Sequence, residues 1–284
     1  MTITQMIILP QILSEIPACP KNLFIKGKGL ESEFEGIAIV GTRKASAEGL
    51  AIAEEFARSL SLAGIPIVSG LAFGIDSAAH RGCLAARGRT VAVLAGGIEK
   101  IYPATNTPLA EKIISSGGSI VSEYQNEPSY PDLFLRRNRI ISGLSKAVII
   151  IEAPLKSGAV STATWAAEQG REVFIVPGPI SHPNYAGSHK LLRDGARLVT
   201  SPEEVLSDLG IKNLAISTPQ DKELPEDALT ILDLISLSHQ AVSIDKIIST
   251  TKLEPQKVMA ILTELTINGS IIETPIGYAN RFKN

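Results

Sequence analysis

The sequence predicts an α/β protein: a doubly wound, Rossmann-like, mostly parallel sheet with helices on both faces, followed by a small C-terminal winged-helix domain. Of the 284 residues, 44% are apolar but only 5% are aromatic, which suits parallel strands buried between helices. Short apolar runs alternate with helical patterns from about residue 37 to residue 209. A second set of helix and strand signals follows residue 226.

The larger domain, residues 37–209, should hold seven strands joined by helices. Apolar residues recur at helical spacing from Leu50 to Leu60, and Gly64 ends that pattern, which predicts the first crossover helix. Ser201, followed by a proline and two glutamates, predicts the last helix. The expected strands are Ile37–Val40, Ile65–Ser69, Thr90–Leu94, Ser119–Glu123, Ala147–Ile151, Glu172–Val176 and Arg197–Thr200.

Three shorter parts precede or follow this domain. Residues 1–36 form a short N-terminal segment. Residues 210–226 show no clear periodicity and contain two prolines, so we expect a linker. Residues 227–284 predict a winged helix, because three helices precede two strands around a glycine. The expected elements are Ala228–Ser238, Ser243–Thr251, Glu254–Asn268, Ser270–Thr274 and Tyr278–Phe282.

The distribution of charge is more informative than the net charge of −2, which by itself argues against a nucleic-acid partner. Residues 225–284 hold five Lys or Arg against seven Asp or Glu, and residues 201–224 hold two against five. Residues 1–200 therefore hold twenty against seventeen. The net excess of +3 lies in the part of the chain that contains the glycine-rich loops.

Neither the cysteines nor the first apolar run indicates a metal, a disulfide or a membrane. Cys19 and Cys83 are far apart, with no Cys-x-x-Cys or Cys/His grouping nearby, so we expect reduced thiols. The run Met6–Leu13 is interrupted by Pro10 and has no basic leader, so it predicts neither a signal peptide nor a spanning helix. We expect a cytoplasmic protein with no membrane partner, no metal and no cofactor.

A candidate phosphate-binding loop follows the first strand directly. Gly41, Thr42, Arg43 and Ser46 lie where backbone N–H groups meet the positive end of a helix dipole. The two hydroxyls add donors, and the guanidinium adds a planar charged fork. The alternative is a tight strand-to-helix turn with Ser46 as the N-cap.

A second glycine-rich loop follows the second strand. Ser69, Gly70 and Gly74 permit close approach of backbone to a ligand, and Asp76 is expected to cap the next helix. His80, one turn later, is either a catalytic base or a packed histidine, and we favour the packed histidine.

The loop after the third strand contains Gly96, Tyr102, Pro103 and Asn106. Its glycines are either ordinary turn residues or further points of backbone approach. Tyr102 and Pro103 offer a face on which a nucleic-acid base can stack.

The densest cationic run of the chain is the stretch 136–139, three arginines and one asparagine. Arginine can bind phosphate in a bidentate manner, so this run is a candidate for DNA contact. Two other interpretations stay open: a solvated helix face, or an arginine paired inside the fold with Glu152 or Asp132.

The loop after the fifth strand adds a lysine and hydroxyls. It contains Lys156, Ser157 and Gly158, and Thr162 lies in the next helix. No Gly-Lys-Ser/Thr sequence is present there, so this is not a Walker loop. Because parallel strands end at one edge of a sheet, these loops should converge where open α/β folds bind ligands. We therefore expect a phosphate-binding pocket at that edge.

No catalytic motif accompanies these loops. The chain has no GxGxxG, GxSxG or HExxH motif and no carboxylate pair at a catalytic spacing, and His182 and His189 are isolated. A nucleophile with a partnered base cannot be assembled. We expect binding without covalent chemistry.

In their order along residues 37–200, the motifs resemble those of the bacterial DNA-processing protein A family (DprA, also called Smf). They are Val40-Gly41-Thr42-Arg43 with Ser46, Ser69–Asp76 with Ala79-His80, Tyr102-Pro103 with Asn106, Ser122-Glu123, Arg137-Asn138-Arg139, Ser157-Gly158 with Thr162, and Val176-Pro177-Gly178. The resemblance implies an extended Rossmann fold that binds single-stranded DNA without strong sequence preference. It also implies a homodimer that loads the RecA recombinase on incoming strands during natural transformation of competent cells.

Carried over to this chain, the resemblance implies that Arg43 and Lys156 contact phosphate, helped by the hydroxyls and amides of the loops. The expected DNA-binding residues are Gly41, Thr42, Arg43, Ser46, Ser69, Gly70, Phe73, Gly74, Gly96, Arg137, Asn138, Arg139, Lys156, Ser157, Gly158 and Thr162. From sequence we do not assign which of the arginines meets phosphate, which surfaces serve dimerisation and RecA, or whether duplex DNA is bound.

Four features qualify the resemblance. The 36 residues before the first strand are too few for the helical N-terminal domain that many members carry. Phe134-Leu135 replaces the commoner Phe-Pro, and Phe73 occupies a position that is often polar or basic, where it can stack on a base. The expected recognition helix, Glu254–Asn268, has one lysine and two glutamates. We therefore expect the winged helix to contact protein, or nothing, rather than DNA.

An enzyme is the main alternative. Phosphoribohydrolases of the lysine-decarboxylase-like group cleave nucleotides at a similar sheet edge with a PGGxGTxxE loop, whose glutamate is catalytic. The corresponding residues here, 152–162, lack that motif. A third interpretation is a sensor of a small nucleotide that binds DNA only incidentally.

Overall fold

The computed structural model describes residues 4–5, 9–211, 225–238, 241–267, 270–274 and 276–280. Contacts between Cα atoms divide the chain into two units, Met1–Ile216 and Ser217–Asn284. Most of the linker expected at residues 210–226 lies outside the described residues.

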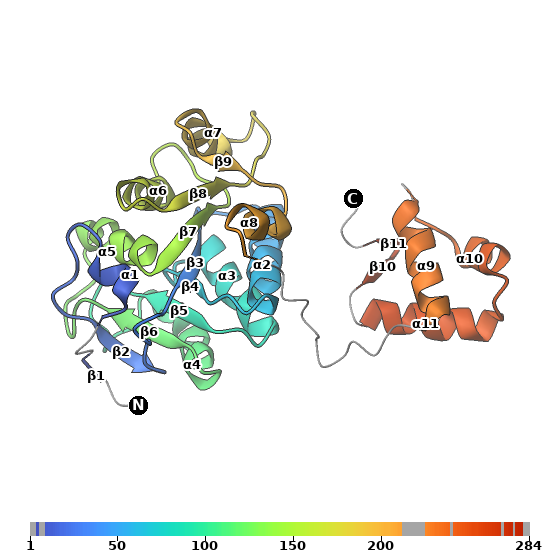
Figure 1. The fold of residues 1–284 in the computed structure, drawn as a ribbon, viewed down its shortest axis with the longest axis horizontal. Coiled ribbons are helices and arrows are strands. Elements are labelled where there is room, and N and C mark those ends of the chain that lie inside the picture. Colours follow the sequence, from blue (N-terminus) through green and yellow to red (C-terminus); the bar gives the residue numbers. More distant parts are fainter. Residues whose placement is uncertain are drawn as a thin grey trace. The chain divides into compact units, whose positions relative to one another are not determined.

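The first unit is built on a mostly parallel sheet (Figure 1). Its described strands lie in the order β1-β2-β6-β5-β4-β3-β7-β8-β9, and from β6 to β9 all neighbours are parallel. These seven strands match the predicted ones to within two residues at each end. They are β3 (Gly36–Val40), β4 (Ile67–Ser69), β5 (Thr90–Val93), β6 (Ser119–Ser122), β7 (Ser145–Ile150), β8 (Glu172–Ile175) and β9 (Arg197–Leu198).

The N-terminal segment supplies two strands that were not predicted. Strand β2 (Phe24–Gly27) pairs antiparallel with β6, and β1 (Thr4–Gln5) pairs antiparallel with β2. Between them lies the short helix α1 (Gln11–Ser14), whose Leu13 belongs to the core. Both strands lie before the alternating strand and helix signals that begin at about residue 37, so their pairing, of β2 with β6 and of β1 with β2, is what identifies them.

Helices cover both faces of the sheet because successive strand residues point to opposite sides. Ile37 and Ile39 pack with α2, α3 and α8, whereas Ala38 and Val40 pack with α1, α5 and α6. The predicted first and last helices are present, and Ser201 caps the last one by accepting from the N–H of Glu204. The helices are α2 (Ala47–Leu62), α3 (Ile75–Ala85), α4 (Thr107–Ser115), α5 (Pro131–Gly143), α6 (Gly158–Glu168), α7 (Ala186–Arg193) and α8 (Pro202–Asp208).

The second unit has the predicted winged-helix order of three helices and a two-stranded antiparallel sheet. Its own core includes Ile231, Ile247 and Leu262. The elements are α9 (Glu226–Leu237), α10 (Ile244–Thr251), α11 (Pro255–Ile267), β10 (Ile271–Thr274) and β11 (Gly277–Asn280); the end of the last expected strand lies outside the described residues. Across the described parts of both units, no helix has the length and apolarity needed to cross a membrane.

Candidate functional site

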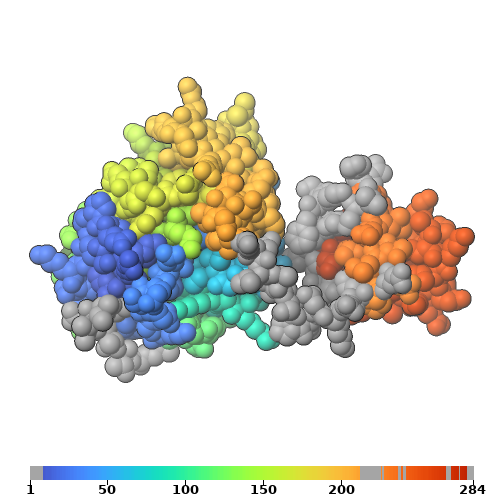
Figure 2. All heavy atoms as spheres, in the orientation of Figure 1, coloured from blue at the N-terminus to red at the C-terminus, as the bar shows by residue number. Residues whose placement is uncertain are grey.

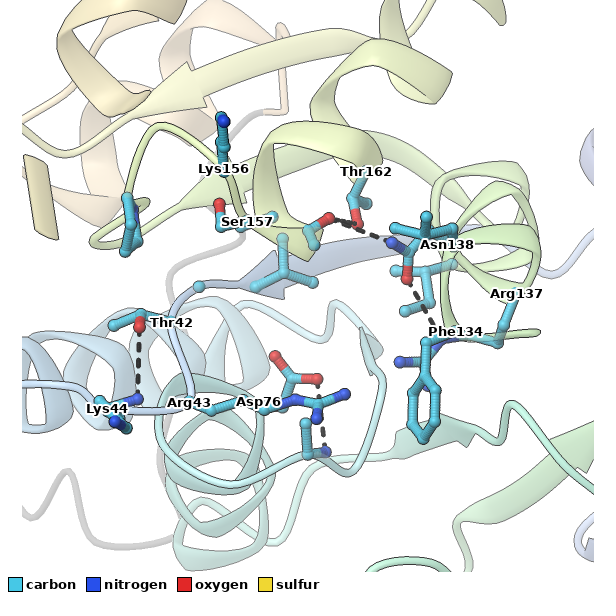
Figure 3. A pocket seen from close by; sticks show the side chains of 18 residues that line it. Thr42, Arg43, Lys44, Asp76, Phe134, Arg137, Asn138, Lys156, Ser157 and Thr162 are labelled. Carbon is cyan, nitrogen blue, oxygen red and sulfur yellow. Dashed lines mark hydrogen bonds between the residues drawn. The ribbon is translucent and has the colours of Figure 1, made fainter. Parts of the chain in front are cut away.

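The order of the strands reverses between β3 and β7, and open α/β sheets bind ligands at such a point. Here the chain leaves β3 toward α2 on one face and leaves β7 toward α6 on the other face. The two departing loops border a hollow of about 380 Å³, which we call the switch-point pocket (Figure 3). It is lined by residues 40–44, Ala72, Asp76, Phe134, Leu135, Arg137, Asn138, Ile141, Pro154, residues 156–159 and Thr162.

Three cations reach the switch-point pocket from its loops. Arg43 and Lys44 follow β3, and Lys156 follows β7; all three side chains are exposed. Within the part of the chain that the structure describes, none of the three forms an ion pair. The Arg43 guanidinium lies over the ring of Phe134, 4.7 Å from the ring centroid. These positive charges are therefore available to an anionic ligand.

A buried carboxylate holds the first loop in place. Glu152 is fully buried and accepts hydrogen bonds from the backbone N–H and the hydroxyl of Ser46, the former at 3.1 Å. It also accepts from Asn184 Nδ2 at 2.8 Å, and the same amide donates to the carbonyl of Lys44 at 3.0 Å. The N–H of Thr42 donates to the Glu152 carbonyl at 2.8 Å. The loop is thus ordered before a ligand arrives, which reduces the entropy lost on binding.

The second loop is shaped by glycines that make room for neighbours. A Cβ atom on Gly70 would lie 2.5 Å from Arg137 Nη2, so the guanidinium occupies the space that a side chain would fill. Gly74 has φ +73°, and a Cβ there would collide with the carbonyl of Thr42. Gly74 therefore lets the second loop pack directly against the first, and Gly70 lets it pack against Arg137.

Asp76 does not cap α3 as predicted. It lies in the first turn of that helix and accepts from the N–H groups of Gly70 at 3.1 Å and Ala72 at 3.4 Å. Burial raises the pKa of this carboxyl group, while the positive charge of Arg137 opposes the rise. Asp76 thus ties the second loop to the helix that follows it.

The arginine run lies in α5, and the alternative of a solvated helix face is wrong for Arg137 and Arg139. Arg137 is 6% exposed and donates to the carbonyls of Gly70, at 2.8 Å, and Val93. Burial lowers the pKa of Arg137 to about 10. Arg139 is 2% exposed and pairs with Glu123 at 2.8 Å, so neither Glu152 nor Asp132 is its partner.

Aromatic rings adjoin the switch-point pocket; those of Phe73 and Tyr102 are exposed, and that of Phe134 is partly exposed. Phe73, Tyr102 and Phe134 line a small depression that shares Arg43 and Phe134 with the pocket. The rings of Tyr102 and Phe134 meet edge to face with 5.6 Å between centroids. The depression gives the site apolar faces beside its cations.

His80 is packed in the core and does not line the pocket. It is fully buried, with Nδ1 2.7 Å from the hydroxyl of Thr90. Because that hydroxyl donates to the carbonyl of Ile67, His80 Nδ1 carries the proton and donates. Burial lowers the pKa of His80 to about 3, so the imidazole is neutral.

Comparison with known proteins assigns both units of the chain to known families. The model of the DNA recombination-mediator protein A family matches residues 2–210, and the model of the DprA winged helix domain matches residues 215–275. The chain belongs to the DNA recombination-mediator protein A family. The resemblance inferred from the motifs and the C-terminal winged helix are both confirmed.

Individual members of the DprA family are similar over most of this chain. Protein Smf of Escherichia coli is 38% identical over 276 residues, which is 95% of this chain and 74% of that protein. DprA from Streptococcus pneumoniae has an X-ray structure that is 40% identical, with a TM-score of 0.64 and 70% of each chain covered. DNA processing protein A from Helicobacter pylori, described for its unique single-stranded DNA binding mode, is 28% identical, with a TM-score of 0.65 and 73% and 95% covered. The chain spans 56% to 74% of the length of the curated relatives.

The DprA-type residues expected at the site are only partly brought together. Those lining the switch-point pocket are Gly41, Thr42, Arg43, Arg137, Asn138, Lys156, Ser157, Gly158 and Thr162. Gly70 and Phe73 line the adjoining depression. The residues outside both are Ser46, Ser69, Gly74, Gly96 and Arg139.

The residues outside the pocket have structural roles. Ser46 caps α2 and binds Glu152, and Ser69 is fully buried and donates to the carbonyl of Ile39 at 2.7 Å. The carbonyl of Gly96 accepts from the hydroxyl of Ser122. The N-cap interpretation is therefore correct for Ser46, and its neighbours Gly41, Thr42 and Arg43 line the hollow.

Polar side chains from α5 and α6 form hydrogen bonds around the start of α6. Asn138 Nδ2 and the hydroxyl of Thr162 both donate to the carbonyl of Gly158, at 3.1 and 3.0 Å. Ser157 caps α6 by accepting from the N–H of Val160. These bonds position the first turn of α6 at the pocket, where its backbone N–H groups can meet an anion.

The pocket residues that were not among the expected DNA-binding residues include Lys44 and Phe134. Lys44 follows Arg43 in the first loop, so its position at the strand end was a usable signal. Phe134 lies in α5, far along the chain from β3. It reaches Arg43 because α5 packs beside the first loop, a contact that spacing in the sequence does not reveal.

Proposed function

We propose that this chain binds single-stranded DNA without strong sequence preference through the switch-point pocket. As a recombination mediator, it would help to load the RecA recombinase on incoming strands during natural transformation. The observation that carries the proposal is that three exposed cations, Arg43, Lys44 and Lys156, line one pocket beside exposed aromatic rings. Membership of the family and the DNA binding described for the Helicobacter relative support it.

The chemistry of the pocket suits an unpaired strand. Cations and backbone N–H groups recognise phosphate whatever the sequence, and phosphate contacts position a strand without reading it. The rings of Phe73, Tyr102 and Phe134 can stack on a base only where that base is unpaired. The protein should therefore prefer single-stranded to duplex DNA.

A homodimer is part of the proposal because one pocket of about 380 Å³ holds few nucleotides. Two pockets on one strand raise the effective concentration of the second contact, so avidity exceeds the affinity of either. Monomeric variants should bind long strands more weakly than the dimer does.

The direct test is fluorescence anisotropy of labelled oligo-dT with Arg43→Ala and Lys156→Ala. Each variant should lose about 1–3 kcal/mol of binding free energy, as expected for a lost charge-assisted contact, and should show a shallower salt dependence. Lys112→Ala is the control, because Lys112 is exposed on the last turn of α4, at the opposite edge of the sheet. If both pocket variants bound like the parent, the pocket assignment would be wrong.

The proposal includes no covalent step. Asp76 is the acidic residue among those lining the pocket, and two backbone N–H groups hold it. Glu152, in the loop where the phosphoribohydrolases carry their glutamate, is buried against Ser46 and Asn184 instead. Incubation with nucleoside monophosphates should release no free base; release would favour the enzyme.

A further inference from the structure

Leu135 separates two hollows on the surface of the first unit. On one side it lines the switch-point pocket, and on the other it lines a hollow of about 640 Å³. We call the second hollow the Trp165 groove; it lies between residues 18–22, the end of β6, α5 and α6. Figure 2 shows the N-terminal residues, in dark blue, next to the yellow-green surface of the α6 region. Leu135 is 53% exposed, so it forms a ridge that a ligand can cross.

The charges of the Trp165 groove favour an anion. Three of its lining residues are cationic, Lys21, Arg136 and Arg139, and one is acidic, Glu123. Arg139 is buried and pairs with Glu123 at 2.8 Å, which neutralises that carboxylate. The charges left facing solvent are Lys21, which is exposed, and the guanidinium of Arg136, whose side chain is 57% exposed.

Arg136 is held in an orientation suited to phosphate. Its guanidinium lies 5.9 Å from the centroid of the Tyr124 ring, and its Nη2 lies 3.4 Å from Glu123. A planar fork that is already oriented loses less entropy when it binds two phosphate oxygens. The ion pair with Glu123 is partly exposed and therefore weak, so a phosphate can compete for it.

An aromatic ring completes the groove. Trp165, on α6, is the single tryptophan of the chain and is partly exposed among the lining residues. A ring beside solvent-facing cations in a groove is the arrangement by which proteins bind single strands, with bases on the ring and phosphates on the cations.

We propose that the Trp165 groove is a second nucleotide-binding site, which takes the continuation of the strand whose phosphates occupy the switch-point pocket. The strand crosses Leu135, places a base against Trp165 and places phosphates near Lys21 and Arg136. This proposal rests on the proposed function and adds the path of the strand. It predicts that affinity grows with strand length within one protomer.

The tryptophan itself reports on the groove, because all indole fluorescence of the chain comes from Trp165. Labelled oligo-dT of about 4 and about 16 nucleotides, which span the usual site sizes of single-strand-binding modules, would be titrated while anisotropy and tryptophan emission are recorded together. The longer strand should quench Trp165 emission. The shorter strand should bind with little quenching because the switch-point pocket alone can hold it.

Two variants separate the groove from the pocket. Trp165→Leu should bind the longer oligonucleotide about 5-fold or more weakly, as expected for one lost stacking contact, and the shorter one like the parent. Lys21→Ala should reduce the salt slope for the longer strand by roughly 0.7, as expected for one phosphate contact, and it tests the groove even if the tryptophan variant fails to fold. Lys112→Ala is again the matched control.

The outcomes distinguish the two proposals. If anisotropy shows binding at both lengths but Trp165 emission stays constant and both variants bind like the parent, the groove proposal is overturned and the pocket stands. If neither oligonucleotide binds, the proposed function fails, and the groove proposal fails with it.

Discussion

Arg43 and Lys156 lie on loops at the carboxyl edge of the sheet, whereas Arg137 and Arg139 lie in α5, beneath and beside the same pocket. The two loop cations are exposed and unpaired among the described residues. The two α5 arginines are 6% and 2% exposed and are bound to carbonyls and a carboxylate. The two buried arginines of the dense cluster thus support the fold, whereas the cations proposed to bind phosphate in the switch-point pocket are exposed at strand ends.

Solvation explains this division. A buried guanidinium must replace its lost water with fixed acceptors, so its partners determine its position and it has little freedom to meet a ligand. An exposed lysine or arginine keeps its water and counterions and releases counterions when phosphate arrives, which is the main source of affinity for nucleic acid. Whether a cation is available to a ligand therefore depends more on its position relative to the strand ends than on the local density of charge in the sequence.

The largest effect should come from Arg137→Ala. The substitution leaves the carbonyls of Gly70 and Val93 without their donor and Asp76 without an opposing charge. We expect a loss of about 3–5 kcal/mol in the free energy of unfolding, measured by urea denaturation. Arg43→Ala should change that free energy by no more than about 0.5 kcal/mol. If both variants lost the same free energy of unfolding, the distinction between buried and exposed arginines would be wrong.

Glu152→Gln should weaken both the fold and the binding of DNA. The amide nitrogen of glutamine would face donors from Ser46 or Asn184 in place of a carboxylate oxygen. We expect a loss of about 1–3 kcal/mol of unfolding free energy, together with weaker oligo-dT binding because the loop of Arg43 is no longer held. Glu111→Gln, at an exposed position on α4, is the matched control. A loss of stability without any change in the affinity for oligo-dT would show that the order of the Arg43 loop does not affect DNA binding.

His80 is a buried base that stays neutral, in contrast to the buried, charged arginines of α5. Because burial lowers its pKa from 6.5 to about 3, the unfolded chain binds more protons than the folded chain between those values. Its contribution to stability is therefore complete above pH 6.5 and falls as the pH drops toward 3. Between about pH 7 and about pH 5 the loss should be roughly 2 kcal/mol, measured from urea midpoints. His80→Asn should flatten that slope; an unchanged slope would contradict the assignment.

The smallest effect should follow from removing the second unit. The winged helix has a core of its own, and its Glu254–Asn268 segment has one lysine and two glutamates. A chain ending at residue 224 should therefore keep its affinity for oligo-dT within a few-fold. A loss near about 100-fold would place essential contacts in the winged helix.

Much of the fold was predictable because buried parallel strands and amphipathic helices leave periodic patterns. All seven predicted strands and the crossover helix α2 occur where expected. Strands β1 and β2 were missed because they lie before the alternating strand and helix signals of residues 37–209. Asp76 was misassigned because a carboxylate near a helix start can serve the preceding loop as well as the cap.

The sequence by itself determined the fold class, the winged helix and the loops at the strand ends, since these depend on local pattern and on the rule that parallel strands end at one edge. Only the tertiary structure decided which charged residues face the pocket. Burial and hydrogen-bond partners come from segments far apart in the chain: α5 supplies Phe134 to Arg43, and β5 and the second loop bind Arg137. Spacing along the chain contains no information on such contacts, because each depends on how helices pack on the sheet.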